Sequence, residues 1–377
     1  MLIGFDGSRA FIKNRTGTEN YSYQLLKALS NIDHENKYIV YLRSQGVSLR
    51  DWPKNFTFKI IKWIRFWTQA GLAIQTFKDN LDVLFIPAHT SPLVHKKGLK
   101  TVVTVHDLGV EYLPKYHQLK QQLYLKYITR YQLSSATKLI AVSKATKDDL
   151  IKKGIDGKKI EVIYEGYDRE NFKPQMSNVK SDRLINSLTP YYVFVGTIQP
   201  RKNLERIIEA FAIHLRGVNK VKSGLHLGGG AKLVIAGSKG WLSDDIYELP
   251  KLLGIDDRVK FLGFVPDKDM RALYSGAEAL LFPSLFEGFG LPILEAQAYG
   301  CPVITSNTSS MPEIAGKGAV FVNPYSVEDI IRGMERVKAN AERVKLIKAG
   351  FENVKKFSWE KCAKETLRVL EQVTSNK

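Results

Sequence analysis

The sequence predicts an α/β protein with two doubly wound, parallel-sheet domains. The chain has 377 residues, a length typical of two domains. Short apolar runs that indicate buried strands alternate with segments of helical spacing, and the pattern restarts in the second half. Alternation of this kind produces parallel sheets covered by helices. Polar residues follow several of the runs, at the strand ends where such sheets bind ligands.

The first domain is predicted to span residues 1–173, followed by a polar linker at 174–188. Helical spacing appears at 20–29 and at 144–153, where Ser143 is a suitable N-cap. Apolar runs predict the strands of this domain at 2–5, 38–42, 56–61, 82–86, 101–105, 138–142 and from 160 onward.

The second domain is predicted to span residues 189–356, with a helical tail at 357–377. Asn203 is a suitable N-cap for a helix that begins at Leu204. Apolar runs predict the strands of this domain at 191–195, 232–237, 259–265, 279–282 and 302–305, and the run 318–321 precedes a predicted helix at 327–337.

The stretch 282–295 carries the strongest functional signal. A buried strand ends at Phe282, glycines surround Phe289, and Pro292 suits the first turn of a following helix. The start of a helix presents N–H groups and a positive dipole end to an anion such as phosphate. Glu287 and Glu295 lie on either side and suit hydroxyl groups, so the stretch indicates a nucleotide sugar. The alternative is an ordinary strand–turn–helix corner with solvated glutamates.

Two cations, Arg201 and Lys202, precede the helix that begins at Leu204. At the carboxyl end of a strand they are suited to bind a diphosphate and to neutralise it as it leaves. The alternative is a pair of solvated side chains.

Polar residues also end strands of the first domain. His89 follows one predicted strand, and His106 and Asp107 follow the next, which places all three at the predicted ligand crevice. Gly17 opens the first helix, where a residue without a side chain lets a ligand approach the backbone. The alternative for this turn is a helix cap formed by Thr16 or Thr18.

These motifs resemble retaining glycosyltransferases of the glycogen-synthase-like superfamily, specifically family GT4. Glu287 and Glu295 have seven residues between them, with Gly-Phe-Gly-Leu-Pro inside. A Gly-x4-Arg-Lys-Asn pattern starts at Gly196, and Thr-Val-His-Asp ends at Asp107. The resemblance covers nearly the whole chain. It implies the GT-B fold, with two facing Rossmann-like domains and a C-terminal helix that crosses back to the first domain.

The resemblance also implies roles for individual residues. It assigns Glu295 to the ribose, Glu287 and the Phe289 N–H to the sugar, and His106 to the outer hydroxyl of that sugar. The remaining implied roles are Asp107 in positioning, Gly17 facing the donor, Phe264 and Val265 at the base, and Arg201, Lys202, Gly290 and Leu291 at the diphosphate.

This chain departs from the family in two places. It has a single glycine near position 17, where many relatives have two. Glu165 and Tyr167 replace the Asn and Val of the family's Asn-Gly-Val-Asp element, in which Gly166 and Asp168 match.

The resemblance implies transfer of a hexose from a nucleotide sugar with retention, in which the leaving phosphate takes the acceptor's proton. We expect no metal cofactor, because Arg201 and Lys202 supply the positive charge and no aspartate pair suits Mg²⁺. GDP-mannose is the favoured donor, with a UDP-sugar as the alternative. The acceptor is expected to be a lipid-linked or polysaccharide intermediate at the inner membrane face.

Charge and composition limit the partners. The net charge is +18, and most of the excess lies in the first half, which suits an anionic membrane or a phosphate-bearing substrate; no nucleic acid is expected. Residues 63–67 place aromatic rings among basic residues, which favours either a membrane interface or a core. Without a predicted signal peptide or membrane-spanning helix, we expect a cytoplasmic protein with Cys301 and Cys362 buried.

Two further classes of function remain open at this stage. One is a nucleotide-sugar epimerase with the same two-domain plan, which would need no acceptor. The other is a non-catalytic module that binds nucleotide sugars or membranes.

Overall fold

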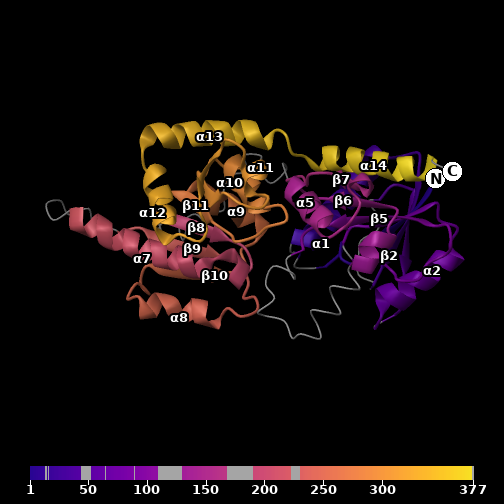
Figure 1. The fold of residues 1–377 in the computed structure, drawn as a ribbon, viewed down its shortest axis with the longest axis horizontal. Coiled ribbons are helices and arrows are strands. Elements are labelled where there is room, and N and C mark those ends of the chain that lie inside the picture. The colour runs from indigo at the N-terminus through magenta and orange to yellow at the C-terminus, as the bar shows by residue number, and fades with distance from the viewer. Residues whose placement is uncertain are drawn as a thin grey trace. The chain divides into compact units, whose positions relative to one another are not determined.

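The computed structural model describes residues 1–12, 15, 17–43, 52–63, 65–88, 90–108, 130–167, 190–221 and 230–375. The chain forms two compact units (Figure 1). Unit 1 comprises Met1–Gly166 and Phe357–Lys377, and unit 2 comprises Tyr167–Lys356. The predicted linker 174–188 lies outside the described residues, as do Thr16, His89 and Asp168.

Unit 1 is built on a parallel sheet in the order β3-β2-β1-β4-β5-β6-β7. The chain runs outward from β1 to one edge, then returns to β4 and runs to the other, which is the doubly wound topology that the sequence predicted. Its strands are β1 (Leu2–Asp6), β2 (Lys37–Leu42), β3 (Phe56–Ile60), β4 (Val83–Ile86), β5 (Lys100–Val105), β6 (Lys138–Ala141) and β7 (Ile160–Val162). Its helices are α1 (Gly17–Ile32), the π-helix Trp67–Leu72, α2 (Ala73–Lys78), α5 (Lys144–Lys152), the 3₁₀ turn Gly157–Lys159 and α14 (Trp359–Ser375).

Unit 2 has a second parallel sheet, in the order β10-β9-β8-β11-β12-β13. Its strands are β8 (Tyr191–Val195), β9 (Lys232–Ala236), β10 (Val259–Gly263), β11 (Ala279–Phe282), β12 (Val303–Ser306) and β13 (Ala319–Val322). Its helices are the 3₁₀ turn Pro200–Lys202, α7 (Leu204–Val221), α8 (Asp244–Leu252), α9 (Asp267–Ser275), α10 (Leu291–Ala298), α11 (Met311–Ala315), α12 (Val327–Arg336) and α13 (Asn340–Val354). Two doubly wound parallel sheets confirm the predicted fold class.

The central strands are continuous apolar runs because helices cover both faces of each sheet. Every residue of β4 and of β11 is buried. Side chains that point to opposite faces of a strand therefore all join a core. Predicted burial also holds for Cys301 and Cys362, which are buried free thiols.

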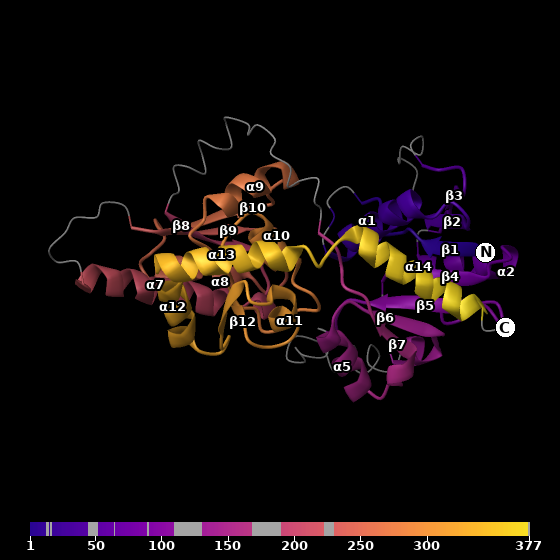
Figure 2. The same cartoon turned by 90° about the horizontal axis from the view of Figure 1, so that it is seen from above.

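The last helix belongs to unit 1 although it is the C-terminal element. α14 packs on α1 and on β4, β5 and β6, and Figure 2 shows α14 beside α1. The rings of Trp359 and Tyr21 lie 5.9 Å apart, centroid to centroid. Gly166 lies so close to the start of α14 that a Cβ there would be 2.2 Å from the backbone nitrogen of Trp359. A glycine is therefore needed where the two parts of unit 1 meet.

Local signals predicted some boundaries and missed others. Ser143 caps α5 as predicted, since its side chain accepts a hydrogen bond from the Thr146 N–H. The prediction of a capping role for the Asn203 side chain is wrong: its Oδ1 accepts from the Arg206 side chain at 2.9 Å, and its amide nitrogen donates to the carbonyls of Pro283 and Pro324. The π-helix Trp67–Leu72 was not predicted. Among the described residues, no helix is both long and apolar enough to span a bilayer.

Gly166→Ala should destabilise unit 1, because the methyl group would displace backbone rather than a flexible side chain. We expect a loss of roughly 3 kcal/mol in the free energy of unfolding, at the upper end for overpacking. Urea unfolding followed by circular dichroism measures it. Gly217→Ala in α7 is the matched control: a Cβ there meets nothing within 4 Å, and alanine should stabilise the helix by about 0.5–1 kcal/mol. An equal effect of both substitutions would contradict the packing argument.

Candidate active site

The main cluster of predicted site residues lies at the carboxyl edge of the unit 2 sheet. The sheet order reverses between β8 and β11, and ligands bind at such reversals in open α/β sheets. Arg201 and Lys202 follow β8, and Glu287 to Leu291 follow β11. The topology therefore brings the two strongest sequence motifs together.

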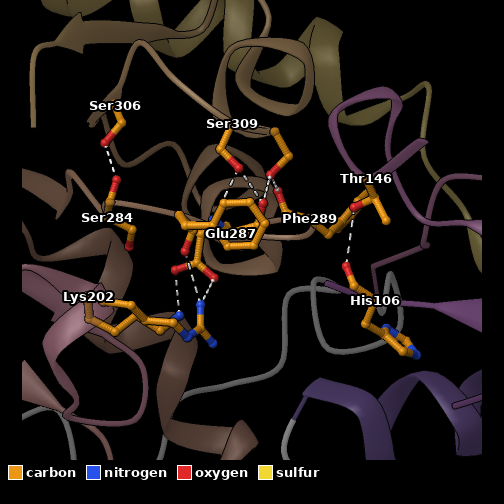
Figure 3. Close-up of polar contacts among 11 residues, drawn as sticks. His106, Thr146, Lys202, Ser284, Glu287, Phe289, Ser306 and Ser309 are labelled. Carbon is orange, nitrogen blue, oxygen red and sulfur yellow. Dashed lines mark hydrogen bonds and ion pairs between the residues drawn. The ribbon is translucent and has the colours of Figure 1, made fainter. Parts of the chain in front are cut away.

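Three charged side chains form a cluster at this position, in which Lys202 and Glu287 are buried and Arg201 is half-buried (Figure 3). Arg201 Nη1 donates to Glu287 Oε2 at 2.6 Å, and Lys202 Nζ donates to Glu287 Oε1 at 2.7 Å. Lys202 is 7% exposed and Glu287 is 5% exposed. Burial acts to raise the pKa of Glu287, but the charges of Arg201 and Lys202 and the Lys202 hydrogen bond lower it to about 2. The carboxyl group is therefore ionised, and the cluster keeps one net positive charge.

The turn that carries the cations is fixed to the loop after β11. Asn203 has a left-handed backbone, with φ of 63°, and its side-chain amide donates to Pro283 O at 2.9 Å. The backbone N–H of Leu285 donates to Arg201 O at 2.9 Å, and Arg201 Nη1 also donates to Phe286 O. These bonds join the loops that follow β8 and β11, so both cations have a defined position.

The glycine turn before α10 is held by two serines. Ser309 Oγ donates to Glu287 O at 2.7 Å, and Ser310 Oγ donates to Glu287 O at 2.9 Å and to Phe289 O at 2.8 Å (Figure 3). Gly290, with φ of 106°, is the N-cap of α10, and Pro292 lies in its first turn as predicted. The positive end of α10 therefore lies beside the Glu287 cluster.

Sequence reasoning assigned no role to Ser309 and Ser310. They precede α11 and lie 22 and 21 residues from the backbone groups that they bind. Two serines before a helix are more simply interpreted as a cap, so no local signal marks this function.

The predicted nucleoside residues lie around the same edge. Tyr274 Oη donates to Glu295 Oε2 at 2.9 Å, which orients the carboxyl group that was assigned to the ribose. Phe264 and Val265 follow β10; the Phe264 ring is exposed and Val265 is half-buried. An exposed ring at a strand end is suited to contact a planar base.

In unit 1, the ring of His106 is engaged by the protein itself. Its Nδ1 lies 3.1 Å from Glu165 Oε1 and its Nε2 lies 2.9 Å from Pro87 O. Both partners are acceptors, so both nitrogens donate only when the ring is an imidazolium. The resemblance implied a contact with a sugar hydroxyl, whereas the structure places both nitrogens against protein oxygens.

The environment of His106 favours the charged ring. Burial lowers the pKa of His106, but the hydrogen bond and charge of Glu165, with Pro87 O and Asp107, raise it above its ordinary 6.5. The His106 carbonyl accepts from Thr146 Oγ1 at 3.3 Å (Figure 3). Asp107 is half-buried beside the ring, and Gly17 is the first residue of α1, where a Cβ would meet nothing within 4 Å.

A cavity of 330 Å³ lies at the carboxyl ends of β1 and β2 in unit 1. Arg9 and Arg43 make it basic, although Arg9 also pairs with Glu19 at 3.1 Å. The sequence offered a weak signal here, a Gly-Ser-Arg run directly after a strand. The cavity is lined by Gly7, Ser8, Arg9, Phe11, Ile12, Leu42 and Arg43.

Comparison with known proteins matches both units to glycosyltransferases. Residues 176–353 match the family model "Glycosyl transferases group 1", and residues 15–171 match "Glycosyltransferase Family 4". The chain is 26% identical over 283 residues to O-antigen chain mannosyltransferase B of Escherichia coli, covering 71% of this chain and 69% of that protein. It is 25% identical over 366 residues to O-antigen chain mannosyltransferase RfbU of Salmonella typhimurium, covering 92% and 95%.

The fold is also that of solved structures. Sucrose-phosphate synthase from Thermosynechococcus elongatus superposes with a TM-score of 0.76 at 18% identity, over the full length of both chains. At this identity the likeness concerns the fold, which is GT-B as predicted.

Glu287→Gln should destabilise the protein at neutral pH, because buried Lys202 loses its counter-charge. We expect a loss of roughly 3 kcal/mol, as for a broken buried ion pair. The lowered pKa means that the stability contributed by Glu287 is complete above pH 4.5 and is lost as pH falls toward 2. Urea unfolding at several pH values should therefore show the difference from wild type shrinking in acid. Glu352→Gln, which removes an exposed pair with Lys355, is the control and should change little.

His106 should give the opposite pH dependence. A raised pKa means that its contribution to stability is complete below pH 6.5 and is lost as pH rises through the folded-state value. The free energy of unfolding of wild type should therefore fall, relative to His106→Gln, as the pH rises above 6.5. Urea unfolding at a series of pH values measures the difference. If the difference is constant, the ring is neutral and the two-acceptor geometry has been misinterpreted.

Proposed function

The chain belongs to the family 4 glycosyltransferases, and from this premise we propose that it transfers mannose from GDP-mannose, with retention, to a lipid-linked or polysaccharide acceptor. Mannose is favoured because both O-antigen relatives described above are mannosyltransferases by name. Both family models describe glycosyltransferases, so neither the epimerase nor the non-catalytic module gains support.

The observation that carries the proposal is the cluster of half-buried Arg201 with buried Lys202 and Glu287. Loss of a nucleoside diphosphate leaves negative charge on the departing phosphate, and catalysis requires that charge to be stabilised as it develops. The cluster has a net positive charge in a buried place, where electrostatic interactions are stronger than in water. The N-terminus of α10 adds its dipole. The two cations are already oriented before a donor arrives, so little reorganisation is needed.

Glu287 has a different role in this proposal from the one that the sequence suggested. Its two carboxylate oxygens are each bound to a cation, at 2.6 and 2.7 Å. It therefore holds Arg201 and Lys202 in place for the diphosphate. Contact with the sugar hydroxyls falls to the backbone of the glycine turn that Ser309 and Ser310 fix.

The reaction is proposed to occur on one face of the sugar. The bond between the anomeric carbon and the β-phosphate oxygen breaks, and the acceptor oxygen forms the new bond to that carbon. The acceptor's proton moves to the departing phosphate oxygen, so no protein base is required. Arg201 and Lys202 stabilise the diphosphate throughout. Independence from metal ions stays a prediction of this scheme.

The ribose and the base of the donor are proposed to bind at the same edge of the sheet. Glu295, oriented by Tyr274, is proposed to accept hydrogen bonds from the ribose hydroxyls. The exposed Phe264 ring and the backbone at Val265 are proposed to contact the base. The acceptor is proposed to bind unit 1, where Arg9 and Arg43 line a cavity suited to an anionic group.

The proposal is tested by donor binding and turnover with the purified full chain. Ligands that bind only the folded state raise the unfolding temperature, so GDP-mannose should give the largest shift in a panel of GDP- and UDP-sugars. Lys202→Ala should lower the rate of nucleotide release from the donor by roughly 100-fold or more. Lys348→Ala, an exposed residue of α13, is the control and should leave the rate unchanged.

Each outcome has a separate meaning. A larger shift with a UDP-sugar would overturn the choice of donor but not the transferase activity. Near-wild-type turnover by folded Lys202→Ala protein would remove the diphosphate role of the cluster. Circular dichroism must accompany these assays, because Lys202 is buried and its loss also affects stability.

A further inference from the structure

One region of unit 1 exposes an unusual number of large apolar side chains. It consists of residues 61–63 and 65–78, which include the π-helix and α2, and residues 90–97. We call it the apolar–basic surface. Phe66 is 75% exposed, Val94 64% and Phe77 55%. The exposed apolar side chains of the surface are Trp63, Phe66, Ile74, Phe77, Leu93 and Val94.

Hydrogen bonds show that the two segments lie side by side. The Gln69 side chain donates to Ser91 O at 3.0 Å and accepts from the Leu93 N–H at 2.8 Å. The Lys96 N–H donates to Thr76 Oγ1 at 3.1 Å. The loop 91–96 therefore runs along the helical segment 69–76, and the exposed side chains of both belong to one continuous region.

The backbone presents these rings at a cost. Phe66 has φ of 55°, in the left-handed region, which is uncommon for a bulky residue and strained. Its ring does not recover that cost by burial. Trp67, the next residue, is by contrast 2% exposed, and the Arg43 guanidinium lies 5.4 Å from its ring centroid. The aromatic run 63–67 is thus divided between core and surface.

The charges of the surface are of one sign. Segments 61–78 and 90–97 contain no Asp or Glu. Lys62, Arg65, Lys78 and Lys97 are exposed among the apolar side chains. The surface therefore combines large apolar groups with exposed cations and has no acidic residue of its own, in a chain of net charge +18.

We propose that the apolar–basic surface docks on an anionic lipid bilayer. Aromatic rings are favourable at the depth of the lipid headgroups, while lysine and arginine reach anionic headgroups with their charged ends. A protein interface is the competing occupant, but lysine is depleted from such interfaces, and three of the four exposed cations here are lysines. The inference is independent of the donor, the sugar and the residues of unit 2.

Vesicle flotation of the full chain tests the proposal. Wild type should float with vesicles of phosphatidylcholine and phosphatidylglycerol, and should stay in solution with phosphatidylcholine alone. The double variant Phe66→Ala/Phe77→Ala removes exposed rings, and Arg65→Glu/Lys97→Glu reverses two charges. Each double variant should weaken partitioning onto the anionic vesicles by roughly 10-fold or more. The charge variant should do so because each basic residue near such a membrane contributes about 1 kcal/mol, and the aromatic variant because it removes the rings that enter the headgroup region.

Matched controls test whether position matters. Leu252→Ala/Val344→Ala removes exposed apolar side chains of unit 2, and Lys345→Glu/Lys348→Glu makes the same change in net charge elsewhere. Both should bind vesicles like wild type. Every variant should keep the thermal shift that GDP-mannose gives with wild type. This control separates loss of membrane docking from loss of the proposed transferase site.

Three results would overturn the proposal. The first is wild-type protein that does not float with anionic vesicles. The second is equal weakening by surface and control variants, which would show only non-specific charge attraction. The third is self-association in analytical ultracentrifugation that Phe66→Ala/Phe77→Ala abolishes without any vesicle binding, which would make the surface a protein interface.

Discussion

Unit 2 depends on Glu287 for the geometry of its ligand edge. The carboxylate of Glu287 binds Arg201 and Lys202 from the loop after β8, and its backbone oxygen accepts from Ser309 and Ser310, after β12. One residue of the loop after β11 therefore fixes the loops of both neighbouring strands. A buried ionic cluster is weak evidence for stability, since an apolar core of similar volume is often as stable. What the cluster supplies is oriented positive charge at the reversal of the sheet.

Unit 1 uses the same type of contact at its own carboxyl edge. His106 follows β5, and its ring joins Pro87 after β4 to Glu165 after β7. Glu165, which stands where the family often has Asn, is one of the two residues that contact the ring. A carboxylate supplies a counter-charge for an imidazolium, which an amide cannot. The residue that departs from the family pattern therefore lies against the His106 ring, and the contact of His106 with a sugar hydroxyl stays a prediction.

The sequence was sufficient for the fold because its signals are local. Continuous apolar runs such as β4 and β11 identify buried parallel strands, and a glycine turn before Pro292 identifies a helix start. The contacts within each site were not predictable in this way. The Arg201–Glu287 pair spans 86 positions and the His106–Glu165 pair spans 59. Nothing in the spacing of such residues shows which of them meet, so their roles were assigned to ligands rather than to each other.

The division of the aromatic run 63–67 between core and surface shows a further limit of local sequence pattern. Buried and exposed lysines differ in a similar way. Trp63 and Trp67 belong to one short aromatic run, but Trp67, the first residue of the π-helix, is buried, whereas Trp63 and Phe66 are exposed. Lys202 is buried with a counter-charge, whereas Lys97 lies on the surface in a segment without one. Ions in solution screen exposed charges over about 10 Å but act little on buried ones. Cations of the first kind therefore suit a fixed diphosphate site, and those of the second suit reversible contact with a charged surface.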